Sequence, residues 1–192
     1  MKKDSDKSYK FYTSIAIFLF KILYRPQVIG KENIPQDGAL LVAGNHKHAF
    51  DPLMVIMSTK RVVHYMAKNE VFKGLAGVIF DRIGLIRIYT NKTNQVAVID
   101  AENVLKEGGT IGIFPEGTRN RTEKELLNFK KGTVRMAKAT NTKILPFAIR
   151  GDYKLFRKSV VVEFGKPIDV SQMEIEEANS YLKEEVLKLL RK

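Results

Sequence analysis

Residues 39–52 read ALLVAGNHKHAFDP and contain the pattern on which the fold prediction rests. The run Ala39–Ala43 is apolar, as expected of a buried strand. The pair Asp51-Pro52 is typical of a helix start, with Asp at the N-cap and Pro at the first helical position. The residues between them, Asn45–Phe50, then form a tight polar turn. The stretch therefore predicts a strand, a turn and a helix in succession.

The same alternation continues along the chain. Further apolar runs predict strands at Val62–Ala67, Leu85–Ile88, Thr110–Phe114, Lys143–Ile149 and Val160–Phe164. Helical patterns lie at Pro52–Ser58, Glu70–Ile79, Asn94–Lys106, Gly132–Thr140 and Gln172–Leu190. Ser171 and Glu174 predict a capping box at the start of the last helix. Alternating strands and helices predict an α/β fold, with a mostly parallel central sheet flanked by helices and a site in the loops after the strands.

The composition is that of a globular chain with excess positive charge. Hydrophobic residues make up 44% of the 192 residues and charged residues 28%, which favours a folded core over disorder. Lys and Arg number 33 against 21 Asp and Glu, a formal charge of +12 that attracts nucleic acid, acidic lipid headgroups or a phosphorylated substrate. The sequence has no Cys, which excludes disulfides, a thiolate nucleophile, Cys-ligated zinc and iron–sulfur clusters.

The N-terminal segment contains an apolar stretch, Phe11–Tyr24, that is shorter than the roughly 20 apolar residues of a spanning helix. It also lacks the cleavage site of a signal peptide. One interpretation is a helix buried in the core. The other, which we favour because Lys residues flank the stretch, is an amphipathic helix lying in the lipid interface. We therefore expect residues 1–25 to associate with a membrane and residues 26–192 to form one domain.

The turn after the first strand contains a histidine and a carboxylate that can face each other, His46 and Asp51. A carboxylate beside an imidazole fixes its tautomer and stabilises the imidazolium that forms when the ring takes a proton, as a general base requires. Asp51 could instead be only an N-cap, and His48 could be the functional ring. His64 lies within a predicted strand and is expected to be structural.

The second polar loop, Phe114–Arg119 (FPEGTR), follows another predicted strand. The guanidinium of Arg119 is a rigid fork of donors suited to a phosphate. Thr118 and the backbone near Gly117 add neutral donors. Glu116 is expected to hold Arg119 in place or to accept a substrate hydroxyl. A surface turn with a local Glu–Arg pair is the alternative.

Together, in this order along the chain, the His46…Asp51 pattern and the Phe114–Arg119 segment resemble the glycerolipid acyltransferases. The resemblance extends over most of the chain. Three further segments are similar to segments of that family: Lys68–Glu70, Phe129–Gly132 and Ile144–Ile149.

The resemblance implies direct transfer of a fatty acyl group from a thioester to the sn-2 hydroxyl of lysophosphatidic acid, giving phosphatidic acid for phospholipid synthesis. His46 would take the hydroxyl proton and Asp51 would orient His46. Lys68 would lie near the oxyanion that develops on the thioester carbonyl. The glycerol phosphate would be held by Glu116, Gly117, Thr118 and Arg119.

One segment departs from the family pattern, in which a block of the type Gly-x-Ile-x-Val-Asp-Arg ends in a basic residue. The corresponding stretch here, Gly84–Thr90, ends in Tyr-Thr, and the similar Phe80–Arg82 comes before the glycine. Arg87 or Lys92 could supply the missing charge. The departure leaves open the same chemistry on another acceptor, such as glycerol 3-phosphate or another lysolipid.

The resemblance also implies the partners. We expect acyl-CoA or acyl-acyl carrier protein as co-substrate, a lysophospholipid acceptor and an anionic membrane surface on the cytoplasmic face, with no bound metal or cofactor. A non-catalytic basic module that binds membranes or nucleic acid is the alternative from another class. Nucleic acid is not expected, because no basic run with interleaved aromatic residues occurs.

Overall fold

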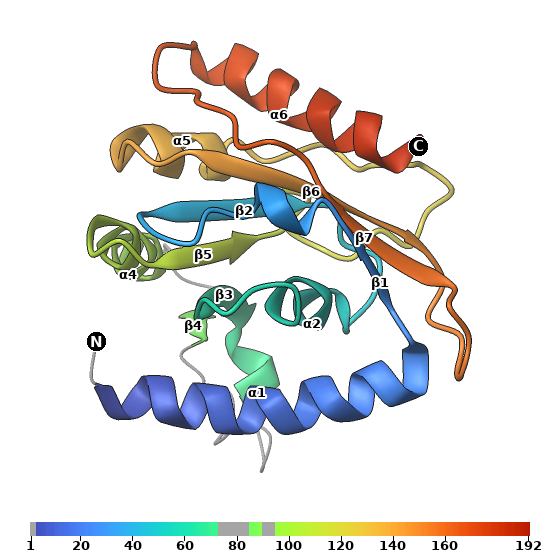
Figure 1. Ribbon diagram of the computed structural model, residues 1–192. Helices are drawn as coiled ribbons and strands as arrows, with labels where there is room; N and C mark the ends of the chain where they lie inside the picture. Colours follow the sequence, from blue (N-terminus) through green and yellow to red (C-terminus); the bar gives the residue numbers. More distant parts are fainter. Residues whose placement is uncertain (1–2, 73–84, 90–94) are drawn as a thin grey trace.

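The computed structural model of the chain describes residues 3–72, 85–89 and 95–192 (Figure 1). Within these residues the central sheet has seven strands in the order β1-β7-β6-β2-β5-β3-β4. Neighbouring strands run parallel, except that β6 and β7 are antiparallel. The strands are Gln27–Ile29 (β1), Leu40–Gly44 (β2), Val63–Lys68 (β3), Ile86–Ile88 (β4), Thr110–Ile113 (β5), Ile144–Gly151 (β6) and Val160–Phe164 (β7). The predicted α/β fold with a mostly parallel sheet is confirmed.

Helices cover both faces of the sheet. The helices are α1 (Lys3–Tyr24), α2 (Asp51–Ile56), α4 (Gln95–Lys106), α5 (Gly132–Ala139) and α6 (Ile175–Leu190), with short 3-10 helices at Lys31–Asn33 and Asn69–Phe72. Figure 1 shows α1 and α2 on one face and α4, α5 and α6 on the other. Each face therefore has its own hydrophobic core.

The central strand β2 contributes to both cores. Leu40 and Val42 pack on the side of α1 and α2, whereas Leu41 and Ala43 pack on the side of α4, α5 and α6. Successive side chains of a strand point to opposite faces, so a fully apolar run is required where both faces are covered. This explains why the run at residues 39–43 has no polar alternation.

The carboxyl ends of the central strands lie side by side. Ala43 near the end of β2 pairs with Ile113 at the end of β5, and Tyr65 of β3 pairs with Gly112. A Cβ atom on Gly112 would lie 2.4 Å from the Tyr65 ring, so only glycine lets that ring lie over β5. The loops after β2 and β5 therefore begin next to each other.

Helix α1 has one buried face and one exposed face. Tyr9 and Phe20 are buried in the core, and the Val63 N–H donates to the Tyr9 hydroxyl at 3.1 Å. Burial raises the pKa of Tyr9 to about 12. The exposed face contains five large apolar residues, here called the apolar stripe: Phe11, Ile15, Phe18, Leu19 and Ile22. No helix in the described part of the chain is both long and apolar enough to span a bilayer.

One local prediction is wrong, one strand has no counterpart among the predicted ones, and one predicted helix lies mostly outside the described residues. Strand β1 was not predicted, because three residues are too few for a pattern to show. The predicted capping box does not form, because α6 begins only at Ile175. The Ser171 N–H donates to the side chain of Asp169, whereas in a capping box it would donate to the side chain of Glu174. Of the predicted helix at residues 70–79, only the short Asn69–Phe72 turn is described, and the remainder lies outside the described residues.

Candidate active site

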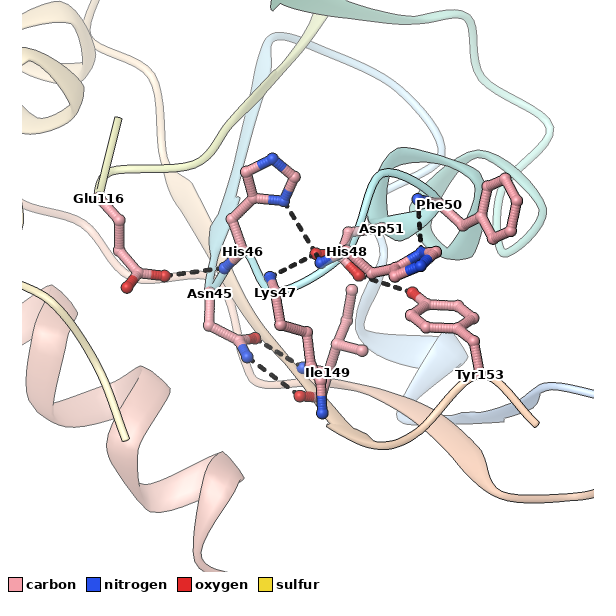
Figure 2. Close-up of polar contacts among 9 residues, drawn as sticks. All are labelled: Asn45, His46, Lys47, His48, Phe50, Asp51, Glu116, Ile149 and Tyr153. Atoms are coloured by element: carbon pink, nitrogen blue, oxygen red, sulfur yellow. Dashed lines mark hydrogen bonds and ion pairs between the residues drawn. The ribbon is translucent and has the colours of Figure 1, made fainter. Parts of the chain in front are cut away.

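His46 and Asp51 meet across the turn that follows β2, as Figure 2 shows. The His46 Nδ1 atom lies 2.8 Å from Asp51 Oδ2. An ionised carboxylate only accepts hydrogen bonds, so the proton of this bond is assigned to Nδ1. The other ring nitrogen, Nε2, then keeps its lone pair and points away from Asp51. The imidazole is therefore arranged to take a proton at Nε2.

Asp51 is fully buried, and four donors converge on its carboxylate. Its Oδ2 atom accepts the His46 Nδ1–H and the backbone N–H groups of Lys47 and His48, the latter two at 2.6 and 2.8 Å. Its Oδ1 atom accepts the hydroxyl of Tyr153 at 2.6 Å. Four donors fit an ionised carboxylate, which has no proton to give.

Asp51 is not the N-cap that the sequence predicts. Phe50 occupies the cap position and Asp51 is the first residue of α2. Because the turn folds back over the helix start, the carboxylate accepts N–H groups from the preceding loop instead of the helix. Asp51 thus fixes the loop and the imidazole together.

The second polar loop holds the backbone of His46. Glu116 Oε1 accepts the His46 N–H at 2.8 Å, and the Asn120 N–H donates to the His46 carbonyl at 2.6 Å. Glu116 Oε2 accepts the N–H of Leu127 at 2.8 Å, and the residue is buried. The prediction that Glu116 holds Arg119 is therefore wrong. Glu116 instead positions His46, because adjacent strand ends bring the two loops into contact.

The imidazole is also fixed by stacking. Phe114 lies flat against His46, with ring centroids 4.0 Å apart and planes 15° apart. Phe114 also stacks with Tyr65, with ring centroids 5.4 Å apart. Asn45, which precedes His46, links the end of β2 to β6. Its side-chain amide donates to the Ile149 carbonyl and accepts the Ile149 N–H.

Tyr153 belongs to this site but was missed by the sequence interpretation. It lies in the loop after β6, and no motif near it signals a role. Burial, and then the neighbouring Asp51 carboxylate, raise the pKa of Tyr153 far above its usual value. The hydroxyl therefore stays protonated and donates to Asp51 throughout the physiological range.

The other two histidines do not share this geometry. His48 Nδ1 accepts the Phe50 N–H at 3.3 Å, and its ring packs against Tyr153. His64 is buried in β3 next to a hollow that is also lined by Arg61 and Thr110. That hollow lies at the amino ends of β3 and β5, at the opposite edge of the sheet from Asp51. The structural role predicted for His64 agrees with this position.

The remaining residues of the second loop form an exposed turn, Gly117–Arg119. Gly117 has φ +69°, a conformation that favours glycine. A Cβ atom at Gly117 would lie 2.7 Å from Lys130 Nζ, so this ammonium lies beside the turn. Arg119 forms no hydrogen bond or ion pair with any residue that the structure describes. The turn therefore presents two cations to solvent.

Lys68 and Arg87 lie at the same edge of the sheet but do not contact the His46–Asp51 pair. Lys68 ends β3 and is exposed. Arg87 lies in β4, where it pairs with Ala67 and donates to Asn69 Oδ1 at 3.3 Å. Lys92 and the segment 80–84 lie outside the described residues. No group of three His, Asp or Glu side chains gathers as metal ligands would in the described part of the chain.

Comparisons with known proteins agree with this geometry. Residues 25–150, a range that contains both polar loops, match the family model described as Acyltransferase. The chain belongs to the acyltransferase family. Both polar loops, after β2 and after β5, lie within the matched region.

Individual relatives extend the similarity beyond the family region. The chain is 32% identical over 177 residues to the 1-acyl-sn-glycerol-3-phosphate acyltransferase of Borreliella burgdorferi, covering 85% of this chain and 70% of that protein. It is 27% identical over 166 residues to the Bacillus subtilis protein of the same name, covering 83% and 82%. The crystal structure of the Thermotoga maritima acyltransferase PlsC superposes with a TM-score of 0.75 at 25% identity, covering 96% of this chain and 78% of that one.

Proposed function

We propose that this chain transfers a fatty acyl group from a thioester to the sn-2 hydroxyl of lysophosphatidic acid, giving phosphatidic acid. The observation that carries the proposal is the His46–Asp51 pair, whose backbone is hydrogen-bonded to the Glu116 loop. Two relatives named 1-acyl-sn-glycerol-3-phosphate acyltransferases support this choice of acceptor.

The proton path follows from the free nitrogen of His46. Nε2 takes the proton of the acceptor hydroxyl as its oxygen attacks the thioester carbonyl carbon. Asp51 stabilises the imidazolium that forms. The attack forms the new C–O bond of the ester. The C–S bond then breaks, and the departing thiolate takes the proton from Nε2. General-base catalysis of this kind contributes about 10²–10⁴-fold in rate.

The exposed turn beside the pair is suited to the acceptor's phosphate. Arg119 offers a planar fork of donors, and Lys130 adds a second positive charge next to Gly117. Thr118 adds a neutral hydroxyl. Because the strands β2 and β5 are neighbours, this turn and His46 both follow the carboxyl ends of adjacent strands.

We assign the remaining sequence-predicted residues to the same edge of the site. The proposed role of Lys68, which is exposed at the end of β3, is to stabilise the developing oxyanion. Arg87 lies one strand further out and supports the binding of anionic groups. The thioester is carried by coenzyme A or by acyl carrier protein, both of which are anionic and suit the +12 charge.

The apolar stripe of α1 is the feature that supports membrane association. Its five large apolar side chains face solvent, while the opposite face of the helix packs into the core. A helix of this kind lies in the bilayer interface and is held by apolar burial and by attraction to anionic lipid. The site would then work at the cytoplasmic face of the membrane.

An acceptor panel tests the proposal. Purified protein with vesicles is offered lysophosphatidic acid, glycerol 3-phosphate and a neutral lysolipid, each with acyl-CoA and with acyl-acyl carrier protein. We expect phosphatidic acid as the main product with one donor or both. Transfer only to another acceptor would replace lysophosphatidic acid in the proposal. Absence of transfer with every pair would favour a binding module.

A further inference from the structure

A second exposed apolar feature lies at the carboxyl end of α1. The β6–β7 loop, residues 152–159, presents Leu155 and Phe156, which are 56% and 58% exposed. The Phe156 N–H donates to the Leu23 carbonyl in the last turn of α1 at 2.5 Å. Figure 1 shows this loop beside the end of α1. The apolar stripe and the loop therefore adjoin each other on the same side of the molecule.

Phe156 combines an unfavourable backbone conformation with an exposed ring. Its φ of +58° lies in the left-handed region, which bulky residues rarely adopt. The ring stacks on no other aromatic ring among the described residues. Strained positions of this kind cluster at active sites, ligand-binding segments and switch regions. Aromatic stacking within the described residues therefore does not offset the strain at Phe156.

The side chains around the β6–β7 loop are mostly cationic, which favours an anionic partner. Lys154, Arg157 and Lys158 are exposed in the loop, and Lys21 and Arg25 are exposed at the end of α1. The loop's acidic residue, Asp152, already lies 3.6 Å from Lys47 and 3.8 Å from Lys154. Apolar side chains surrounded by an excess of positive charge match the interface of an anionic bilayer, where lipid tails lie beneath negative headgroups.

We propose that the β6–β7 loop is a second lipid-contacting element, with Leu155 and Phe156 entering an anionic bilayer beside the apolar stripe. The inference rests on the proposed membrane association of α1. Tyr153, in the same loop, donates to Asp51. A docked loop therefore holds the His46–Asp51 pair at the bilayer surface, where the headgroup of a lysolipid lies.

The sequence has no Trp, so a single introduced Trp reports the surroundings of one position. Three full-chain variants are compared: Phe156→Trp in the loop, Phe18→Trp in the apolar stripe, and Val96→Trp as a control. Val96 is 70% exposed on α4, which packs on the opposite face of the sheet. Emission is recorded with phosphatidylglycerol–phosphatidylcholine vesicles, with and without brominated acyl chains.

We expect blue-shifted and bromine-quenched emission for Phe156→Trp and Phe18→Trp, and neither effect for Val96→Trp. A response of Phe18→Trp without one of Phe156→Trp would overturn the loop inference and leave the membrane association of α1 intact. No response from either position would overturn both.

A binding measurement gives a second, independent outcome. Leu155→Ser/Phe156→Ser is expected to weaken binding to the anionic vesicles by about tenfold or more. The matched double variant Val96→Ser/Ile99→Ser on α4 should bind as the unmodified chain does, and thermal unfolding checks that both variants fold. Unchanged binding would contradict the proposal. Self-association without lipid that the loop variant abolishes would also contradict it, because the surface would then bind a second copy of this chain.

Discussion

The two polar turns that follow β2 and β5 are neighbours in space and differ in how much of their structure is already fixed. In the first turn, His46 and Asp51 have their side chains and backbone held by hydrogen bonds and stacking. In the second, Gly117–Arg119 is exposed, and the Arg119 guanidinium has no partner among the described residues.

The difference separates two tasks within one site. Groups that move a proton must be held in place before the substrate arrives, because reorganisation during the reaction raises the barrier. Groups that bind the acceptor need donors that are still available. Changes in the first turn should therefore lower kcat, whereas changes in the second should mainly raise the KM for the acceptor.

The largest effect is expected from Asp51→Asn. An amide has only one acceptor oxygen, and its NH₂ group would face N–H and O–H donors that now bond to the carboxylate. The hydrogen bond that fixes the tautomer and the orientation of the His46 imidazole would therefore be lost. We expect kcat to fall by about 10²–10⁴-fold. Steady-state kinetics measures this. Asp152→Asn, an exposed carboxylate of the β6–β7 loop, is the control, and an equal loss there would show that the effect is not specific to Asp51.

A smaller loss is expected from Glu116→Gln. Glu116 accepts hydrogen bonds from two backbone N–H groups, those of His46 and Leu127. In the Gln variant one of these N–H groups would face the amide NH₂ and lose its acceptor. The free energy of unfolding should fall by about 1–3 kcal/mol, as measured by urea denaturation, and kcat should fall with it. If stability and kcat matched those of the exposed-site variant Glu123→Gln, Glu116 would not position His46.

Arg119→Lys tests the open turn. The positive charge remains, but the two-pronged donor is lost, so the KM for lysophosphatidic acid should rise about tenfold. The KM for the thioester and the stability should not change, because Arg119 is exposed. Arg121→Lys provides the comparison. Equal acceptor KM values for the two variants would remove Arg119 from the phosphate site.

The smallest effect is expected from Tyr153→Phe, which removes one of the four donors on Asp51. The other three remain, so kcat should fall about threefold to tenfold while both KM values stay constant. Tyr181→Phe on α6 controls for the loss of a hydroxyl. A change in KM without one in kcat would place Tyr153 in substrate binding and not in positioning.

The fold was predictable from the sequence because strand and helix patterns are local. The run at residues 39–43 is apolar on both faces, and this alone indicates a central strand. Short or edge elements such as β1 carry too few residues for a pattern. The sequence places the start of the last helix at Gln172, whereas α6 begins at Ile175. The Ser171 N–H bonds to the Asp169 side chain instead of forming the predicted capping box, and residue spacing alone does not reveal this contact.

The candidate site was only partly predictable. His46 and Asp51 are close in sequence, so their contact follows from one tight turn. The role of Glu116 depends on which loop lies beside it, and that depends on the strand order. Tyr153 is brought to Asp51 from a loop far along the chain. Contacts of this kind depend on the tertiary fold and carry no local signal.

The most direct test compares His46→Ala with His48→Ala, two histidines of the same turn. The measurement is kcat/KM for lysophosphatidic acid with the preferred thioester. The account predicts a loss of about 10²–10⁴-fold for His46→Ala, and less than about tenfold for His48→Ala, whose Nδ1 already accepts the Phe50 N–H. The reverse order, or equal activity in the two variants, would contradict the assignment of His46 as the base.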